Sequence, residues 1–186
     1  MVPLTSLLLP IVLSTVFVFI VSSIIHMVLP IHRNDLRKLP NEDAVIEALR
    51  AAGVSKGDYM FPRAASMKDA HSPEMTAKFE RGPAGLMSVF PPGPPRMMVG
   101  LALWALFCLV ISVFAAYLAG RTLAPGTHYL AVFRVTGAAA FLAYGIGQLP
   151  DSIWRGQAWG TTLKHCADGL VYALVTAGTF GWLWPA

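Results

Sequence analysis

Long hydrophobic stretches alternate with polar segments along the 186-residue chain. Residues 4–29 and 97–120 contain no Asp, Glu, Lys or Arg, and two further stretches run over about 129–149 and about 163–184 with few charges. At about 1.5 Å per residue, a helix of each length crosses about 30 Å of hydrocarbon. Backbone amides inside a bilayer need internal hydrogen-bond partners. The pattern therefore predicts an all-α membrane protein whose fold is a bundle of four transmembrane helices.

The ends of two stretches need interpretation. Residues 4–29 could be taken for a signal peptide, but they lack a basic n-region, their apolar run is long, and no small-x-small cleavage site follows. We therefore predict an uncleaved first span. We expect the third stretch to stop at Pro150, because proline cannot continue a helix.

Between the first span (1–29) and the last three (97–186), the composition is that of a soluble segment. Of the chain's 14 basic and 10 acidic side chains, 10 and 8 lie in residues 30–96. Short helices are predicted near 42–52 and 73–81. The first would begin after Asn41 as N-cap, with acidic residues in its first turn, and the second would be capped by Ser72.

The remainder of the insert lacks helical periodicity. Residues 59–62 form a small apolar anchor, expected to rest on the membrane or the bundle. Residues 82–95 are rich in Gly and Pro and read as a stiff connector, with 86–90 as a short apolar piece. The insert is too small and too poor in apolar residues for an independent core, so we expect it to fold onto the bundle or a partner.

Basic residues near the span ends indicate the orientation. They lie mainly in 30–96 and between the third and fourth stretches, where Arg155 and Lys164 are found, while only Arg121 lies between the second and third. The positive-inside rule then predicts a cytoplasmic insert, both termini outside, and a multi-pass protein of the bacterial inner (plasma) membrane. The net charge of +4 fits this bias rather than a nucleic-acid surface, and the charge partition excludes an ordinary soluble enzyme.

Small residues recur every four positions in three of the stretches. Such spacing lets membrane helices approach closely, either within one bundle or against a partner protein, and the sequence leaves both uses open. The three sets are Ser112, Ala116 and Gly120; Ala139, Ala143 and Gly147; and Gly169, Ala173, Ala177 and Gly181.

Polar residues within spans are costly and are therefore candidate functional residues. His26 lies near the predicted cytoplasmic end of the first span, and His165 and Asp168 lie in the first turns of the fourth. These three could share one layer that carries protons, holds a metal, or hydrogen-bonds a quinone headgroup. Two histidines on different spans also match a bis-imidazole haem site.

A structural alternative exists for Asp168. Lys164 lies four residues earlier and His165 three, so both could pair with Asp168 on one helix face and stabilise the helix start. His32 is expected to be solvated. Arg134 lies near the outer end of the third span, too far along the membrane normal to pair with Asp168. We expect it to snorkel toward the surface or bind an anionic lipid headgroup.

No set of nucleophile, base and orienting group can be assembled, so no enzymatic activity is predicted. The first hypothesis is a non-catalytic accessory or structural subunit of a larger membrane complex. It would bind other membrane subunits, or a second copy, through its small-residue faces and Pro-rich insert. The alternative is a redox or proton-handling protein that binds haem or quinone near His26, His165 and Asp168.

Two segments carry a resemblance to a known family. They are residues 22–30, followed by Arg33-Asn34-Asp35, and residues 158–185, which include Ala158-Trp159-Gly160-Thr161-Thr162 and Asp168-Gly169-Leu170. The chain resembles an uncharacterised family of small bacterial integral membrane proteins with four spans. The resemblance implies a four-span fold and no assigned activity.

Overall fold

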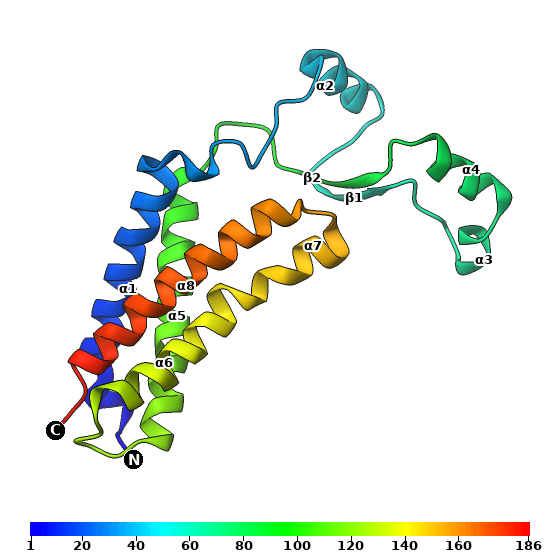
Figure 1. The fold of residues 1–186 in the computed structure, drawn as a ribbon. Coiled ribbons are helices and arrows are strands. Elements are labelled where there is room, and N and C mark those ends of the chain that lie inside the picture. Colours follow the sequence, from blue (N-terminus) through cyan, green and yellow to red (C-terminus); the bar gives the residue numbers. More distant parts are fainter. The chain divides into compact units, whose positions relative to one another are not determined.

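The computed structural model describes residues 1–186, most of them helical, in two compact units. The helical unit comprises Met1–Asp35 and Arg96–Ala186, and the polar insert comprises Leu36–Pro95. Four long helices make up most of the helical unit (Figure 1). They are α1 (Leu8–Ser23), α5 (Met97–Thr122), α6 (Tyr129–Tyr144) and α8 (Trp159–Trp182).

Three helical segments are long and apolar enough to cross a membrane: Leu4–Val28, Met97–Thr122 and Tyr129–Arg155. The first joins η1 (Leu4–Leu7), α1 and a π-helical turn, η2 (Ile24–Val28). Helix α8 has 24 residues but is not in this set, because its first turns carry the polar group Lys164, His165 and Asp168. Length and composition therefore identify three candidate spans.

The third segment corrects one prediction. It does not stop at Pro150 but continues through η4 (Ile146–Gln148) and α7 (Leu149–Arg155). Pro150 lies in the first turn of α7, where a missing N–H breaks no helical hydrogen bond. The 3-10 turn η4 lies just before Pro150, so the chain stays helical from α6 into α7.

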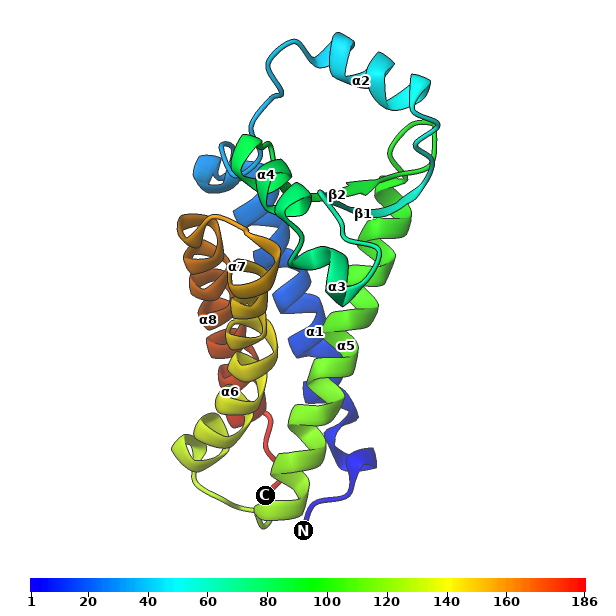
Figure 2. The ribbon, with the colours of Figure 1, turned by 90° about the vertical axis from the view of Figure 1, so that its right-hand side faces the viewer.

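The long helices pack side by side within the unit (Figure 2). Helix α8 contacts α6 and α1, and α5 contacts α1 and α6. Small residues line the contacts of α8, where Gly169, Ala173 and Ala177 are buried. On α6, the buried face is shifted by one residue from the predicted set of small residues. Ala140 and Tyr144 are buried, whereas Ala143 and Gly147 are exposed.

Two glycines show how closely the backbones approach. A Cβ on Gly169 would lie 2.5 Å from the Cα of Gly145. A Cβ on Gly120 would lie 2.6 Å from the carbonyl oxygen of Val2. Gly169 and Gly120 therefore pack against other segments of the same chain rather than against a partner.

Backbone hydrogen bonds close the end of the unit where both termini lie (Figure 1). The Val2 N–H donates to the Gly120 carbonyl at 2.8 Å, and the Gly126 N–H donates to the Pro185 carbonyl at 2.8 Å. The indole N–H of Trp184 donates to the Ala124 carbonyl at 3.0 Å. Main-chain groups thus join the N-terminus, the α5–α6 connection and the C-terminus.

The polar insert contains α2 (Glu42–Ala51), α3 (Met67–Ala70) and α4 (Pro73–Arg81). Helices α2 and α4 lie close to the ranges expected from the sequence. The Ser72 hydroxyl accepts a hydrogen bond from the Met75 N–H, as a cap should. Asn41 departs from prediction: it adopts a left-handed conformation with φ 50°, and its side chain makes no cap hydrogen bond.

A two-stranded antiparallel sheet corrects the all-α class. Strand β1 (Gly57–Phe61) pairs with β2 (Gly85–Val89), so the predicted apolar anchor and the apolar piece of the connector are hydrogen-bonded partners. Tyr59 lies opposite Met87, and Met60 lies opposite Leu86. The pairing joins segments about 25 residues apart in the chain, a distance over which local periodicity gives no signal.

The insert has little interior. Met75 is its one buried hydrophobic side chain, whereas every other buried hydrophobic residue belongs to the helical unit. Met60 and Leu86 remain 50% and 49% exposed on one face of the sheet. Its elements therefore depend on caps, turns and strand pairing more than on a core.

Candidate histidine–carboxylate site

The site begins where α1 loses its regular helical geometry. Residues Ile24–Val28 form the π-helical turn η2, closed by the Leu29 N–H donating to the Ile24 carbonyl at 3.1 Å. Such turns are frequent at functional sites, and this one carries His26. A short 3-10 turn, η3 (Pro30–His32), follows and places His32 close to α8.

Helix α8 supplies the other half of the site. Lys164 and Asp168 lie four residues apart, so both project from one face of its first turns. The contact between Gly169 and Gly145 brings this part of α8 against the end of α6. Asp168 is consequently buried, with 7% of its surface exposed.

Asp168 faces two histidine rings. Its Oδ2 lies 2.9 Å from Nε2 of His32 and 3.7 Å from Nε2 of His26. The two rings stack with centroids 4.4 Å apart and planes inclined at 28°. Despite the short distance, His32 Nε2 and Asp168 Oδ2 are not aligned as a hydrogen bond, and neither buried atom has another hydrogen-bond partner.

A second carboxylate orients His32 from the opposite side. Oδ2 of Asp35 lies 2.6 Å from Nδ1 of His32, and the Lys164 ammonium donates to Asp35 Oδ1 at 2.6 Å. Lys164 also donates to the Ile31 carbonyl at 2.9 Å. The hydrogen bond from Lys164, helped by His32, holds the pKa of Asp35 below its ordinary value of 3.8 despite partial burial.

This geometry changes two sequence-based expectations. His32 is not solvated, because only 11% of its side chain is exposed between the two carboxylates. Lys164 does not pair with Asp168 but reaches Asp35, since the η3 turn brings that carboxylate closer to the ammonium. The proposed ion pair along one face of α8 is therefore not formed.

The candidate residues His26, His165 and Asp168 do lie in one region. His26 approaches Asp168, and its ring centroid lies 6.4 Å from that of His165. Nε2 of His165 lies 4.0 Å from Oδ2 of Asp35, so His165 sits beside the second carboxylate.

Sequence reasoning missed His32 and Asp35. The available signal was a His-x-x-Asp spacing that begins two residues after Pro30, a residue that ends the preceding helix and starts a turn. That spacing lets an imidazole and a carboxylate meet within one turn, as the 2.6 Å contact shows. Nothing in the spacing indicates that the turn folds against α8.

A haem does not fit among these histidines. The predicted pair, His26 and His165, have ring centroids 6.4 Å apart, but axial imidazoles stand on opposite faces of the macrocycle, and here the His32 ring stacks on His26 with centroids 4.4 Å apart. The His165 ring stacks in turn on His32, with centroids 5.3 Å apart. For a quinone headgroup, the obvious cationic donor is Lys164, whose ammonium already donates to Asp35 and Ile31.

Arg134 belongs to a different part of the unit. It is exposed on α6, five residues after Tyr129, whose ring packs against Gly181 near the C-terminal end of α8. Asp168 lies at the other end of the α6–α8 contact, beside Gly169. Arg134 forms no salt bridge, which agrees with its expected separation from Asp168.

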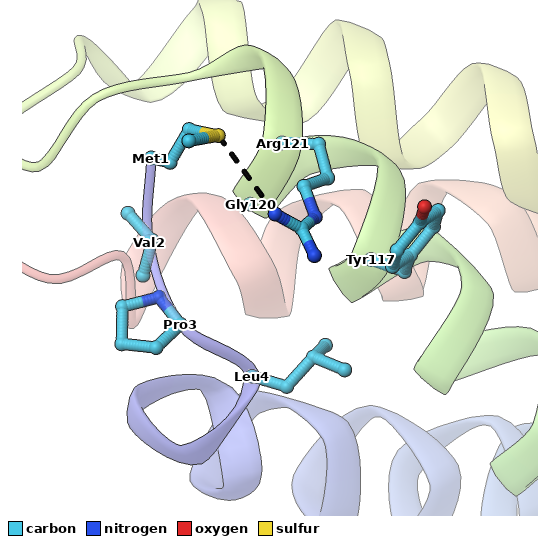
Figure 3. A pocket seen from close by; sticks show the side chains of 7 residues that line it. All are labelled: Met1, Val2, Pro3, Leu4, Tyr117, Gly120 and Arg121. Atoms are coloured by element: carbon cyan, nitrogen blue, oxygen red, sulfur yellow. Dashed lines mark hydrogen bonds between the residues drawn. The ribbon is translucent and has the colours of Figure 1, made fainter.

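A pocket opens at the end of the helical unit that holds the termini (Figure 3). Its volume is about 380 Å³, and it is lined by residues 1–4 together with Tyr117, Gly120 and Arg121. The Arg121 guanidinium lies 5.6 Å from the centroid of the Tyr117 ring and 3.9 Å from the sulfur of Met1. No carboxylate or histidine lines this pocket, so its chemistry differs from that of the histidine–carboxylate site.

Comparisons with family models, curated proteins and solved structures give no match for this chain. The chemistry of the site therefore has to be argued from its own atoms. Those atoms are three imidazole rings, two carboxylates and one ammonium, brought together from the end of the first span and the start of α8.

Proposed function

We propose that this chain is a four-span integral membrane protein that binds a cation at its histidine–carboxylate site. One observation carries the proposal: the buried His32 Nε2 and Asp168 Oδ2 approach to 2.9 Å without a hydrogen bond. Asp35 faces Nδ1 of His32, so a neutral ring that donates its proton to Asp35 presents the Nε2 lone pair toward Asp168. A lone pair facing a carboxylate needs a positive charge between or beside them.

The fourth span is α8. Its 24 residues match a bilayer in length, and its lysine, histidine and aspartate side chains are confined to the first turns, where they face the site rather than lipid. Trp182 stands at its other end, as an interfacial aromatic should.

The positive-inside rule then assigns the site to the cytoplasmic face of a bacterial inner membrane, with both termini outside. A membrane-impermeant maleimide tests this orientation in intact cells, in a background carrying Cys166→Ala. We expect Thr127→Cys to be labelled before permeabilisation and Ser55→Cys only afterwards. The reverse order of labelling would overturn the orientation, and labelling of both in intact cells would overturn the four-span count.

Cation binding is tested on the full-length protein in detergent by equilibrium dialysis against Mg²⁺, Mn²⁺, Ni²⁺ and Zn²⁺ in turn. We expect retention of one of these ions that is lost in the double variant Asp35→Asn/Asp168→Asn. A matched control is the double variant Asp58→Asn/Asp69→Asn, which removes two carboxylates from the polar insert. If no ion is retained, or if both double variants lose it equally, the proposed function is wrong.

A role as an accessory subunit is the second candidate, favoured by the shallow interior of the polar insert. A segment that buries only Met75 among its hydrophobic side chains gains stability from a surface outside itself. The exposed pair Met60 and Leu86 is the apolar part of such a surface. Mild-detergent purification from the native host should co-purify a membrane protein that Met60→Ser/Leu86→Ser releases, whereas an unaccompanied wild-type chain contradicts this role.

A further inference from the structure

We infer that the cation is a divalent first-row transition-metal ion whose ligands are Nε2 of His26, Nε2 of His32 and Oδ2 of Asp168. This inference rests on the proposed function and specifies the ion class and the ligands. The three residues come from η2, η3 and α8, and each offers one donor atom within 4.8 Å of the other two. Two imidazole nitrogens and a carboxylate oxygen are a common protein donor set for Zn²⁺ and its neighbours.

The distances suit a bound ion with small adjustments. Metal–nitrogen and metal–oxygen bonds of about 2.0–2.2 Å place two tetrahedral ligands about 3.3 Å apart. The observed separations from Asp168 Oδ2 are 2.9 Å to His32 and 3.7 Å to His26, one below and one above that value. Shifts of a few tenths of an ångström therefore bring both separations to the tetrahedral value.

Burial and the missing hydrogen bonds supply an independent argument. Asp168 is 7% exposed, and its Oδ2, like Nε2 of His32, has no hydrogen-bond partner. Buried polar atoms without partners cost free energy, and a cation between them removes that cost. The His26 side chain is 42% exposed, so the ion would keep an entry path and an open coordination position toward solvent.

Asp35 and Lys164 act as positioning residues behind the ligands. Asp35 accepts from Nδ1 of His32, which fixes the tautomer and points Nε2 at the ion, the usual arrangement of carboxylate, histidine and metal. Lys164 holds Asp35 in place through the 2.6 Å hydrogen bond. Replacing such an outer carboxylate commonly weakens metal affinity by about 10–100-fold.

The second group of possible ligands is less suitable. His32, Asp35 and His165 also bring donor atoms within 4.8 Å. However, the Lys164 ammonium occupies one oxygen of Asp35 and would repel a divalent ion there. His165 therefore belongs beside the site and is not a ligand.

Co²⁺ and Zn²⁺ are the probes, and the full-length protein in detergent is the sample. Co²⁺ held by nitrogen and oxygen ligands at low coordination number gives visible d–d absorption bands, and Zn²⁺ displaces it. We expect one Co²⁺ per chain, loss of the bands in His26→Gln and Asp168→Asn, and an affinity lowered about 10–100-fold in Asp35→Asn. His165→Gln is the matched control and should keep the bands.

The outcomes separate the two proposals. If Mg²⁺ alone is retained in dialysis and Co²⁺ gives no bands, cation binding stands and the transition-metal assignment falls. If the bands survive in His26→Gln and vanish in His165→Gln, the ligand assignment is wrong. Protein folding is checked by thermal unfolding, in which Zn²⁺ should raise the midpoint of the wild type and of His165→Gln but not of His26→Gln.

Discussion

Chain segments at the two ends of the helical unit are joined by different kinds of interaction. At the end that holds the termini, backbone and indole N–H groups donate to carbonyls, as Val2 does to Gly120 and Trp184 to Ala124. At the other end, ionisable side chains join the first span to α8, with Lys164 bonded to Asp35 and Ile31. The first end leaves Arg121 as its one ionised side chain near the pocket, whereas the second gathers three histidines and two carboxylates.

The difference shows that holding the helix ends together does not require the ionisable groups found at the second end. Neutral hydrogen bonds suffice to hold helix ends together, as the end with the termini shows. The cluster at the other end contains more polar groups than this task needs, and it leaves Asp168 Oδ2 and His32 Nε2 unsatisfied. Natural structures rarely keep such atoms unpaired without a function, so the asymmetry between the ends is itself evidence for a site.

The largest expected effect comes from the contact that positions Asp168. In Gly169→Ala, the new Cβ would lie 2.5 Å from backbone atoms of Gly145, which cannot rotate away as a side chain would. Helices α6 and α8 must then separate, at a cost of about 3 kcal/mol in the free energy of unfolding. Unfolding in mixed detergent micelles measures this loss, and Co²⁺ affinity should fall with it.

Gly160→Ala is the matched control on the same helix. A Cβ at Gly160, the second residue of α8, meets nothing within 4 Å, so alanine fits there without a clash. Gly169→Ala should therefore lose stability, whereas Gly160→Ala should not. Equal losses in both would show that the contact at Gly145 is not what positions α8.

The next effect concerns the charged link between the first span and α8. Lys164→Met removes hydrogen bonds to Asp35 and Ile31 and leaves His32 as the one hydrogen-bond partner of the Asp35 carboxylate. Because the Lys164 side chain is 37% exposed, we expect a loss of about 1.5 kcal/mol, at the lower end for charged hydrogen bonds. The same micelle unfolding measures it, with the exposed Lys68→Met as control. A change no larger than in the control would mean that the link does not stabilise the unit.

Much of the fold follows from hydrophobic length and local signals. Three membrane-length helices were predictable because apolar runs of this size with few or no charges have few alternatives. Helix α4 was predictable because Ser72 and Pro73 are strong start signals. The β1–β2 pairing and the continuation past Pro150 were not, because each depends on partners that local sequence does not identify.

The candidate site was predictable only in part. The rise per residue predicts how deep each residue of a span lies in the membrane, and it places His26, His165 and Asp168 at a similar depth. It gives neither rotation about the helix axis nor the path of a turn after a span. The roles of His32 and Asp35 depend on that turn, and the choice between His26 and His165 as ligand depends on rotation, so both required three-dimensional geometry.

A smaller effect is expected at the end that holds the termini. Trp184→Phe keeps the aromatic ring but removes the N–H that donates to the Ala124 carbonyl at 3.0 Å. The loss should be about 0.5–1 kcal/mol, typical of one neutral hydrogen bond, with no change in Co²⁺ affinity. Trp182→Phe, whose side chain is 69% exposed and makes no such bond, is the control. If metal affinity changes in Trp184→Phe, the two ends are coupled and cannot be treated as independent.

The smallest effect on stability is expected at the residue with the largest role in binding. In metal-free protein, the Asp168→Asn amide can donate to Nε2 of His32, replacing two facing acceptors by a hydrogen bond. Its gain offsets the changed contacts, so the free energy of unfolding should move by less than about 0.5 kcal/mol while Co²⁺ binding is lost. Unfolding is measured after chelator treatment. A loss above about 1.5 kcal/mol would show that the carboxylate already pairs with a protonated His32, so that Asp168 Oδ2 and His32 Nε2 are not two unpaired acceptors.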